Sequence, residues 1–272
     1  MKRLTQIFSQ VFLAVVLTLL LPLQVSAFHL IPPSPPPAPT PPPVPEAPGD
    51  YPEPTDPSVR VHVFVHAPKP NHRQPATAGV CNPTSNDPAT YTLAGWHLAT
   101  NVTYNLNPSS APSSVRPVFG EVTTDSFTTW RSAVNNKVTF SQGNNTSKSR
   151  SSYDRLNIVA FGRTSSSTIG VTYIRYLVAT KEVVDVDTIL NNRLAWDWTD
   201  PITGDPDASC GNLYAYDLQD ILVHETGHWL GLDDRYDTES EDLTMYGYGA
   251  KGELKKDTLQ SGDLTGVVAI YP

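Results

Sequence analysis

A proline-rich run near the N-terminus limits which part of this chain can form a compact fold. The chain has 26 prolines in 272 residues, and many of them lie in the run "LIPPSPPPAPTPPPVPEAPGDYPEPTDP". Proline lacks the amide hydrogen that helices and sheet ladders need, so closely spaced prolines favour an extended, solvated polyproline conformation. We therefore expect residues 28–57 to form a disordered spacer. The alternative is a proline-rich ligand for a recognition domain.

The residues before this run have the features of a secretory signal. Lys2 and Arg3 precede an apolar run over 11–23, and the small residues "VSA" end at Ala27. This order predicts a signal peptide over 1–27 and a secreted, extracellular protein. The alternative is an uncleaved membrane anchor with the folded part outside the membrane, although the apolar run is short for a span.

The net charge argues against one class of partner. The leader holds two basic residues and no acidic one, which leaves 17 Lys and Arg against 27 Asp and Glu, a net charge near −10. Nucleic-acid-binding proteins present basic stripes to phosphates, and this chain has no such stripe. We expect no nucleic-acid partner. The sequence leaves the oligomeric state open, with a monomer as the simplest expectation.

Apolar residues alternate directly after the spacer. In "SVRVHVFVH", the valines within 59–65 share one face of a predicted strand, and His62 and His66 share the other. We interpret the two histidines as inert surface residues, since nothing near them in the sequence completes a site. Residues 58–80 are predicted to be a short strand with a linker, or a pro-piece, and the main domain to span 81–272.

Strand and helix patterns alternate within the main domain. The predicted strands are "NVTYNLNP", "KVTFSQ", "RLNIVAFG", "TIGVTYIRYLV" and "EVVDVDTIL". An amphipathic helix is predicted in "TTDSFTTWRSAVNN", a second helix begins near Asp217, and a last one lies in "SGDLTGVVAIYP". This order predicts an α+β fold, an α/β sandwich with a mixed twisted sheet.

The stretch "LQDILVHETGHWLGLDDRY" contains the candidate metal ligands and the candidate catalytic base. His224 and His228 are four residues apart, so both imidazoles leave one face of a helix. Glu225 points to the side, where it can take a proton from a water. Gly231 allows the helix to end and the chain to reverse, which brings Asp234 back as a third ligand. Two His and one Asp with an open position make a catalytic zinc site. The alternative is an amphipathic helix followed by surface acids.

"HETGHWLGLDD" resembles the zinc-binding signature of the metzincin metallopeptidases, and the chain over about 83–272 is similar to their matrixin-like group. The resemblance implies that Met245, in "DLTMYGYG", forms the Met-turn beneath the metal, and that "SGDLTGVVAIYP" is the C-terminal helix. Asp234 stands where matrixins usually have a histidine, as in snapalysin-type proteases. Gly247 replaces the proline that helps to wall the substrate pocket.

The resemblance therefore implies a secreted zinc-dependent endopeptidase. His224, His228 and Asp234 would bind one zinc ion, and Glu225 would activate its water to cleave an extended polypeptide. The segment "STIGVTYIRY" would form the upper edge of the cleft and bind the peptide by strand addition. The alternative is a metal-stabilised binding module on a proline-rich stalk, without catalysis. Acidic runs such as "DVD" are only weak candidates for calcium, because no full oxygen-ligand loop is present.

Cys81 and Cys210 are the two cysteines of the chain. In an oxidising compartment, a disulfide between them would close a loop of about 130 residues and stabilise the fold by up to ~4–5 kcal/mol. The alternative is a Cys81 thiolate that covers the metal in a latent form, but "AGVCNPTS" has no charged residue to hold such a plug.

Overall fold

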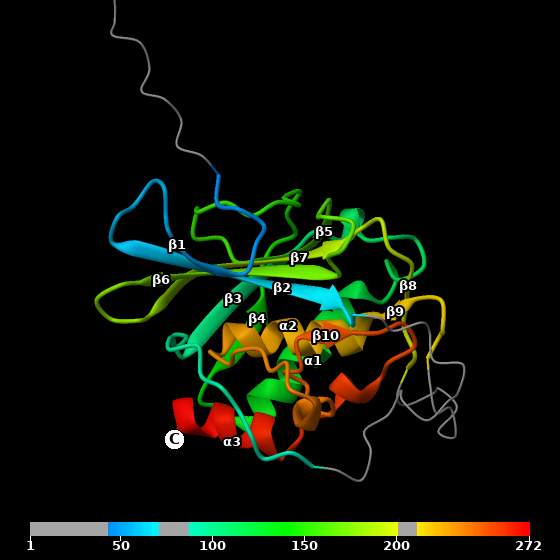
Figure 1. Ribbon diagram of the computed structural model, residues 1–272. Helices are drawn as coiled ribbons and strands as arrows, with labels where there is room; N and C mark the ends of the chain where they lie inside the picture. Colours follow the sequence, from blue (N-terminus) through cyan, green and yellow to red (C-terminus); the bar gives the residue numbers. More distant parts are fainter. Residues whose placement is uncertain (1–42, 71–86, 201–210) are drawn as a thin grey trace, which may run out of the picture. The chain divides into compact units, whose positions relative to one another are not determined.

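The computed structural model describes residues 43–70, 87–200 and 211–272, and the description that follows is limited to them. Within these ranges, an eight-stranded mixed sheet is accompanied by three α-helices, of which the last lies at the C-terminus (Figure 1). The predicted α+β class is confirmed. The predicted signal peptide and both cysteines, Cys81 and Cys210, lie outside the described residues.

The strands of the main sheet are β1 (Gly49–Pro52), β2 (Val59–Pro68), β3 (Asn101–Leu106), β4 (Thr139–Gln142), β5 (Ile158–Gly162), β6 (Gly170–Leu177), β7 (Val183–Asn191) and β10 (Tyr248–Gly249). A separate small pair consists of β8 (Trp196–Asp197) and β9 (Tyr216–Asp217). The α-helices are α1 (Phe119–Ala133), α2 (Leu218–Trp229) and α3 (Ser261–Ile270), and short 3-10 helices are η2 (Pro108–Ser110), η3 (Thr238–Ser240) and η4 (Lys255–Asp257).

The strand order is β1-β2-β6-β7-β5-β3-β4, with β10 paired to β2 outside this path. Strands β7, β5, β3 and β4 run parallel to one another. Strand β6 is antiparallel to β7, and β2 and β1 continue the antiparallel half of the sheet. Helices α1 and α2 lie on one side of the sheet (Figure 1). The middle of the sheet and α2 therefore enclose the main core between them.

Local sequence accounts for these elements. All residues of β5 are buried, as the continuous apolar run predicted. The predicted strands "TIGVTYIRYLV" and "EVVDVDTIL" pair with one another as the β6–β7 hairpin. Helix α2 begins where the side chain of Asp217 accepts hydrogen bonds from the amides of Gln219 and Asp220, which satisfies two of the amides left over at a helix start. In α1, the buried Trp130 indole donates to the carbonyl of Val223, which fixes α1 against α2.

The predicted limits of the spacer and of the main domain are not those of the fold. Gly49–Pro52 forms β1, although it lies in the segment predicted to be a spacer. Val59–Pro68 is an interior strand of the main sheet, although the main domain was predicted to begin at 81. Pro52 is tolerated in β1 because β1 is an edge strand, where a missing amide donor leaves no partner unsatisfied. This short strand was not predicted because the proline content of the run favours an extended spacer.

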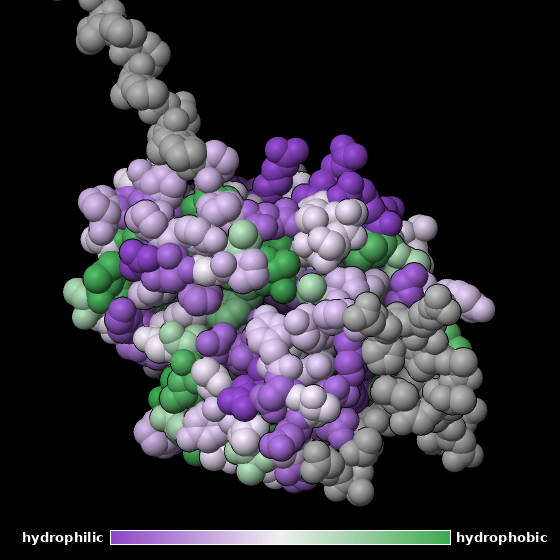
Figure 2. Space-filling model, viewed as in Figure 1, coloured by the Kyte–Doolittle hydropathy of each residue, from purple (hydrophilic) through white to green (hydrophobic). Residues whose placement is uncertain are grey.

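Figure 2 shows one face of the molecule, on which apolar residues appear in separated patches among hydrophilic ones. Within the described residues, we find no helix with the length and hydropathy to cross a membrane.

Candidate metal centre

Helix α2 and the turn after it bring three predicted ligands together. The Nε2 atoms of His224 and His228 lie 3.3 Å and 3.5 Å from Oδ1 of Asp234. Both histidines are fully buried, and the Asp234 side chain is 5% exposed. None of these three atoms has a hydrogen-bond partner. Buried polar atoms without partners are costly, so three that face one another indicate a shared ligand.

The other ring nitrogens of the two histidines are held by backbone carbonyls. Nδ1 of His224 lies 2.8 Å from the carbonyl of Thr244, and Nδ1 of His228 lies 2.9 Å from that of Leu232. A carbonyl can only accept, so each Nδ1 carries the hydrogen and each neutral ring presents a lone pair on Nε2. Burial lowers the pKa of both histidines, which favours this neutral form.

The turn after α2 directs Asp234 to the histidines. Gly231 has a φ of 103°, the left-handed conformation predicted for it. A Cβ at this position would lie 2.6 Å from the carbonyl oxygen of Trp96, so a side chain is excluded for a second reason. Burial raises the pKa of Asp234, but His228 and His224 outweigh this effect and hold it below the usual value. Asp234 is therefore an anion directed at two imidazole lone pairs.

Glu225 lies beside the three ligands at the end of a hydrogen-bond chain. The indole of Trp229 donates to Thr188, 3.0 Å away, and Oγ1 of Thr188 lies 2.7 Å from that of Thr172. The Thr172 hydroxyl donates to Oε2 of Glu225 at 2.5 Å, so the Thr188 hydroxyl must donate to Thr172. Burial raises the pKa of Glu225, and this hydrogen bond opposes the rise. The other oxygen, Oε1, has no hydrogen-bond partner.

Met245 packs directly against α2, at Gly227. A Cβ on Gly227 would lie 2.3 Å from the sulfur of Met245, so only glycine allows this contact. The Asp263 carboxylate, from α3, accepts hydrogen bonds from the amides of Thr244 and Met245 at 2.9 Å and 3.1 Å. Helix α3 thus fixes the turn whose Thr244 carbonyl orients His224.

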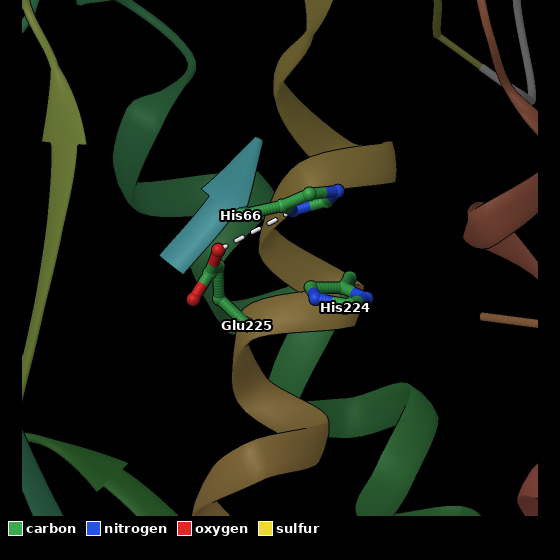
Figure 3. Close-up of side chains that lie close together, drawn as sticks. All are labelled: His66, His224 and Glu225. Carbon is green, nitrogen blue, oxygen red and sulfur yellow. Dashed lines mark ion pairs between the residues drawn. The ribbon is translucent and has the colours of Figure 1, made fainter. Parts of the chain in front are cut away.

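His66 is the residue of this site that sequence reasoning missed. Its ring centroid lies 4.0 Å from that of His224, and its Nδ1 lies 3.4 Å from Oε1 of Glu225 (Figure 3). The residue is 1% exposed, and neither of its ring nitrogens has a hydrogen-bond partner. Burial lowers its pKa to about 3, so it is neutral. The interpretation of His66 as an inert surface residue is wrong, because β2 is an interior strand whose histidine face is directed at α2.

The remaining candidates have other partners. Asp185 and Asp187, from the "DVD" run considered for calcium, form ion pairs with Arg175 at 2.8 Å and 3.0 Å. His62 lies on the same face of β2 as His66 but packs against Trp96, with ring centroids 5.3 Å apart. Neither set joins the group around α2.

Two overlapping sets of side chains can hold a metal ion among the residues that the structure describes. One is His224, His228 and Asp234, and the other is His66, His224 and Glu225, with ligand atoms of each set within 4.8 Å of one another. The first set fits zinc, since it offers two neutral imidazoles and one carboxylate, each with a buried atom that has no other partner. No protein-family model matches the sequence, and no curated protein matches it.

Proposed function

We propose that this chain is a secreted zinc-dependent endopeptidase of the metzincin type, with a matrixin-like domain. One observation carries the proposal. Two neutral imidazoles and a carboxylate direct unpartnered atoms at one point, and Glu225, a buried glutamate outside this set of three, lies beside them. A purely structural zinc site would more often use four protein ligands and would not need that glutamate.

The fold supports the family as well as the chemistry. Four mutually parallel strands, β3, β4, β5 and β7, and the antiparallel strand β6 precede the helix that carries the motif, and the turn at Met245 and a C-terminal helix follow it. The resemblance predicted these elements in this order. Asp234 in place of a third histidine leaves a site with one negative charge, which lowers the net positive charge that a zinc ion would retain.

The proposed reaction is hydrolysis of a peptide bond. A bound zinc ion would polarise the scissile carbonyl and make a water more acidic. Oε1 of Glu225, which has no hydrogen-bond partner, would accept the proton of the attacking water and pass it to the leaving amine. Thr172 holds the other oxygen and so fixes the direction in which Oε1 points. His224 and His228 are oriented for their part by two carbonyls.

The test compares two glutamate variants of the zinc-loaded chain. Glu225→Ala should abolish casein cleavage and retain stoichiometric zinc, because the glutamate is a base and not a ligand. Glu239→Gln is the matched control, since Glu239 is exposed and should leave both properties unchanged. Wild-type cleavage should be lost with a chelator and restored by zinc. Cleavage that persists in Glu225→Ala would contradict the proposal, and zinc-dependent stability without cleavage by any form of the chain would favour the binding module.

A further inference from the structure

Strand β2 occupies the edge of β6 to which we assign the substrate. One edge of β6 pairs with β7, and the other pairs with β2 through eight residue pairs, from Val59 opposite Leu177 to His66 opposite Gly170. Residues 59–66 of β2 therefore fill the position at which a peptide would add to the edge of β6.

Strand β2 also passes directly over the catalytic glutamate. Up to His66 it pairs with β6, and from Ala67 it pairs instead with Tyr248 and Gly249 of β10. The amide of Ile169 donates to the His66 carbonyl at 2.7 Å. The backbone is thus held by one strand on each side of the point at which it changes partner. An extended substrate would need the same two-sided support around its scissile bond.

Two side chains of β2 cover the metal-binding histidines. The ring of Phe64 stacks on that of His228, with centroids 3.7 Å apart and an interplanar angle of 7°. The ring of His66 lies against that of His224, and the dashed line in Figure 3 joins it to the carboxylate of Glu225. A water or a substrate carbonyl that reacts at Glu225 needs this space, so neither can enter while β2 is docked.

We propose that β2 is an intramolecular inhibitor that occupies the substrate position of the peptidase, with His66 blocking Glu225 and Phe64 covering His228. This inference rests on the proposed function and adds its regulation. The enzyme is latent while β2 is paired with β6, and release of β2 opens the cleft. The inhibitor acts through a sheet ladder and two aromatic rings, and it uses no cysteine.

The packing of β2 is consistent with a segment that can leave. Among the described residues, Phe64 is the one residue of β2 that belongs to the main hydrophobic core. Val61 and Val63 belong to a separate small cluster with Val171 and Tyr173. These four residues lie on the face of the sheet opposite to the metal site. Loss of β2 would therefore expose a small cluster and would leave the main core nearly complete.

The ion pairs of β6 are also satisfied without the segment. Glu53, which follows β1, binds the buried Arg175 at 3.0 Å. Arg175 has two further carboxylate partners, Asp185 and Asp187, both within the main domain. The departure of Glu53 would leave Arg175 paired. A second ion pair, between Lys69 and Glu241 at 2.7 Å, is partly exposed and therefore contributes little to the docking of the segment.

The decisive experiment releases β2 without altering the metal site. The double variant Val61→Asp, Val63→Asp places two carboxylates in the small apolar cluster, which opposes docking. Casein cleavage by the zinc-loaded variant should rise by about tenfold or more, since even one such buried charge shifts a two-state equilibrium by that factor. Val178→Asp is the matched control, because Val178 is 44% exposed and its change should leave activity as it was.

A synthetic peptide of residues 58–69 provides the reverse test. Added to the double variant, it should restore inhibition, while the same peptide with Phe64→Ala and His66→Ala should inhibit far less at equal concentration. This comparison separates the side-chain block from pairing alone. A peptide that is cleaved between His66 and Ala67 instead of inhibiting would overturn the inhibitor role and identify β2 as a substrate segment.

The outcomes distinguish this inference from the peptidase proposal. If intact chain and double variant cleave casein equally, β2 does not inhibit, although the peptidase proposal stands. If the double variant loses cooperative thermal unfolding, β2 is a permanent part of the fold and the inference fails. If no form cleaves any peptide while all bind zinc, the peptidase proposal fails and the inference fails with it.

Discussion

The hydrogen bond from Thr172 to Glu225 gives a prediction with a defined sign and size. Oγ1 of Thr172 lies 2.5 Å from Oε2 of Glu225 and donates to it, so the bond stabilises the carboxylate over the neutral acid. Thr172→Val replaces the hydroxyl by a methyl group of similar volume. The variant keeps the strand and the packing but removes the donor, and the pKa of Glu225 should rise.

The size of this rise follows from the strength of the bond. A hydrogen bond to a charged group contributes about 1.5–3 kcal/mol. Because one pKa unit corresponds to about 1.4 kcal/mol, the pKa of Glu225 should rise by about 1–2 units. In the proposed mechanism Glu225 acts as a base only when it is ionised, so activity should increase as the pH rises through this pKa. The acidic limb of the pH profile should therefore move by about 1–2 units toward higher pH, with the plateau above it nearly unchanged.

The assay is the pH dependence of kcat/KM for a quenched peptide, measured in a form with β2 released. Thr188→Val is the matched control, since it removes the previous member of the chain and leaves the Thr172 donor in place. Its limb should move less than that of Thr172→Val. An unmoved acidic limb in Thr172→Val would show that Thr172 does not set the protonation of Glu225, and that another group is the base.

Three further predictions concern the metal and its support. Asp234→Ala should weaken zinc binding sharply, while Asp234→His should retain the ion; normal zinc affinity in Asp234→Ala, measured by competition with a chromogenic chelator, would mean that the third ligand is misassigned. Gly227→Ala would place a methyl group 2.3 Å from the Met245 sulfur and 2.8 Å from the ring of Trp130. Such overpacking should lower the free energy of unfolding by about 1–3 kcal/mol in urea titrations, and an unchanged midpoint would refute that packing argument. Zinc at about 100 times its Kd should add about 2.7 kcal/mol to the free energy of unfolding, so its removal with a chelator should lower the Tm. A Tm that does not change with zinc would exclude a site of this kind.

The elements near the site could be predicted because their signals are local. The Asp217 cap, the spacing of His224 and His228, and the positive φ of Gly231 are each decided within a few residues. A helix start, a helix face and a helix end depend on neighbouring backbone groups, which the sequence displays directly. The buried run of β5 is similar, since an apolar stretch of that length between polar loops has few other uses.

His66 could not be identified in the same way, because its role depends on a pairing between distant segments. The alternation in "SVRVHVFVH" correctly placed His62 and His66 on one face. Which face met α2 was decided by the pairing of β2 with β6, more than a hundred residues later in the chain. Pairing with β2 likewise gave β1 an edge position, which tolerates Pro52. The composition of a segment contains no information about the distant strand with which it pairs.

The two departures from the matrixin pattern, Asp234 and Gly247, are physically connected through Tyr236. The Tyr236 hydroxyl donates to Oδ2 of Asp234 at 2.9 Å, and burial together with the Asp234 charge raises the pKa of the phenol, which keeps it a donor. This bond leaves Oδ1 of Asp234 directed at the histidines. A Cβ on Gly247 would lie 2.4 Å from the Tyr236 ring, so any side chain there would displace the donor. Gly247 therefore serves the third ligand, and an aspartate at this site requires the glycine thirteen residues later.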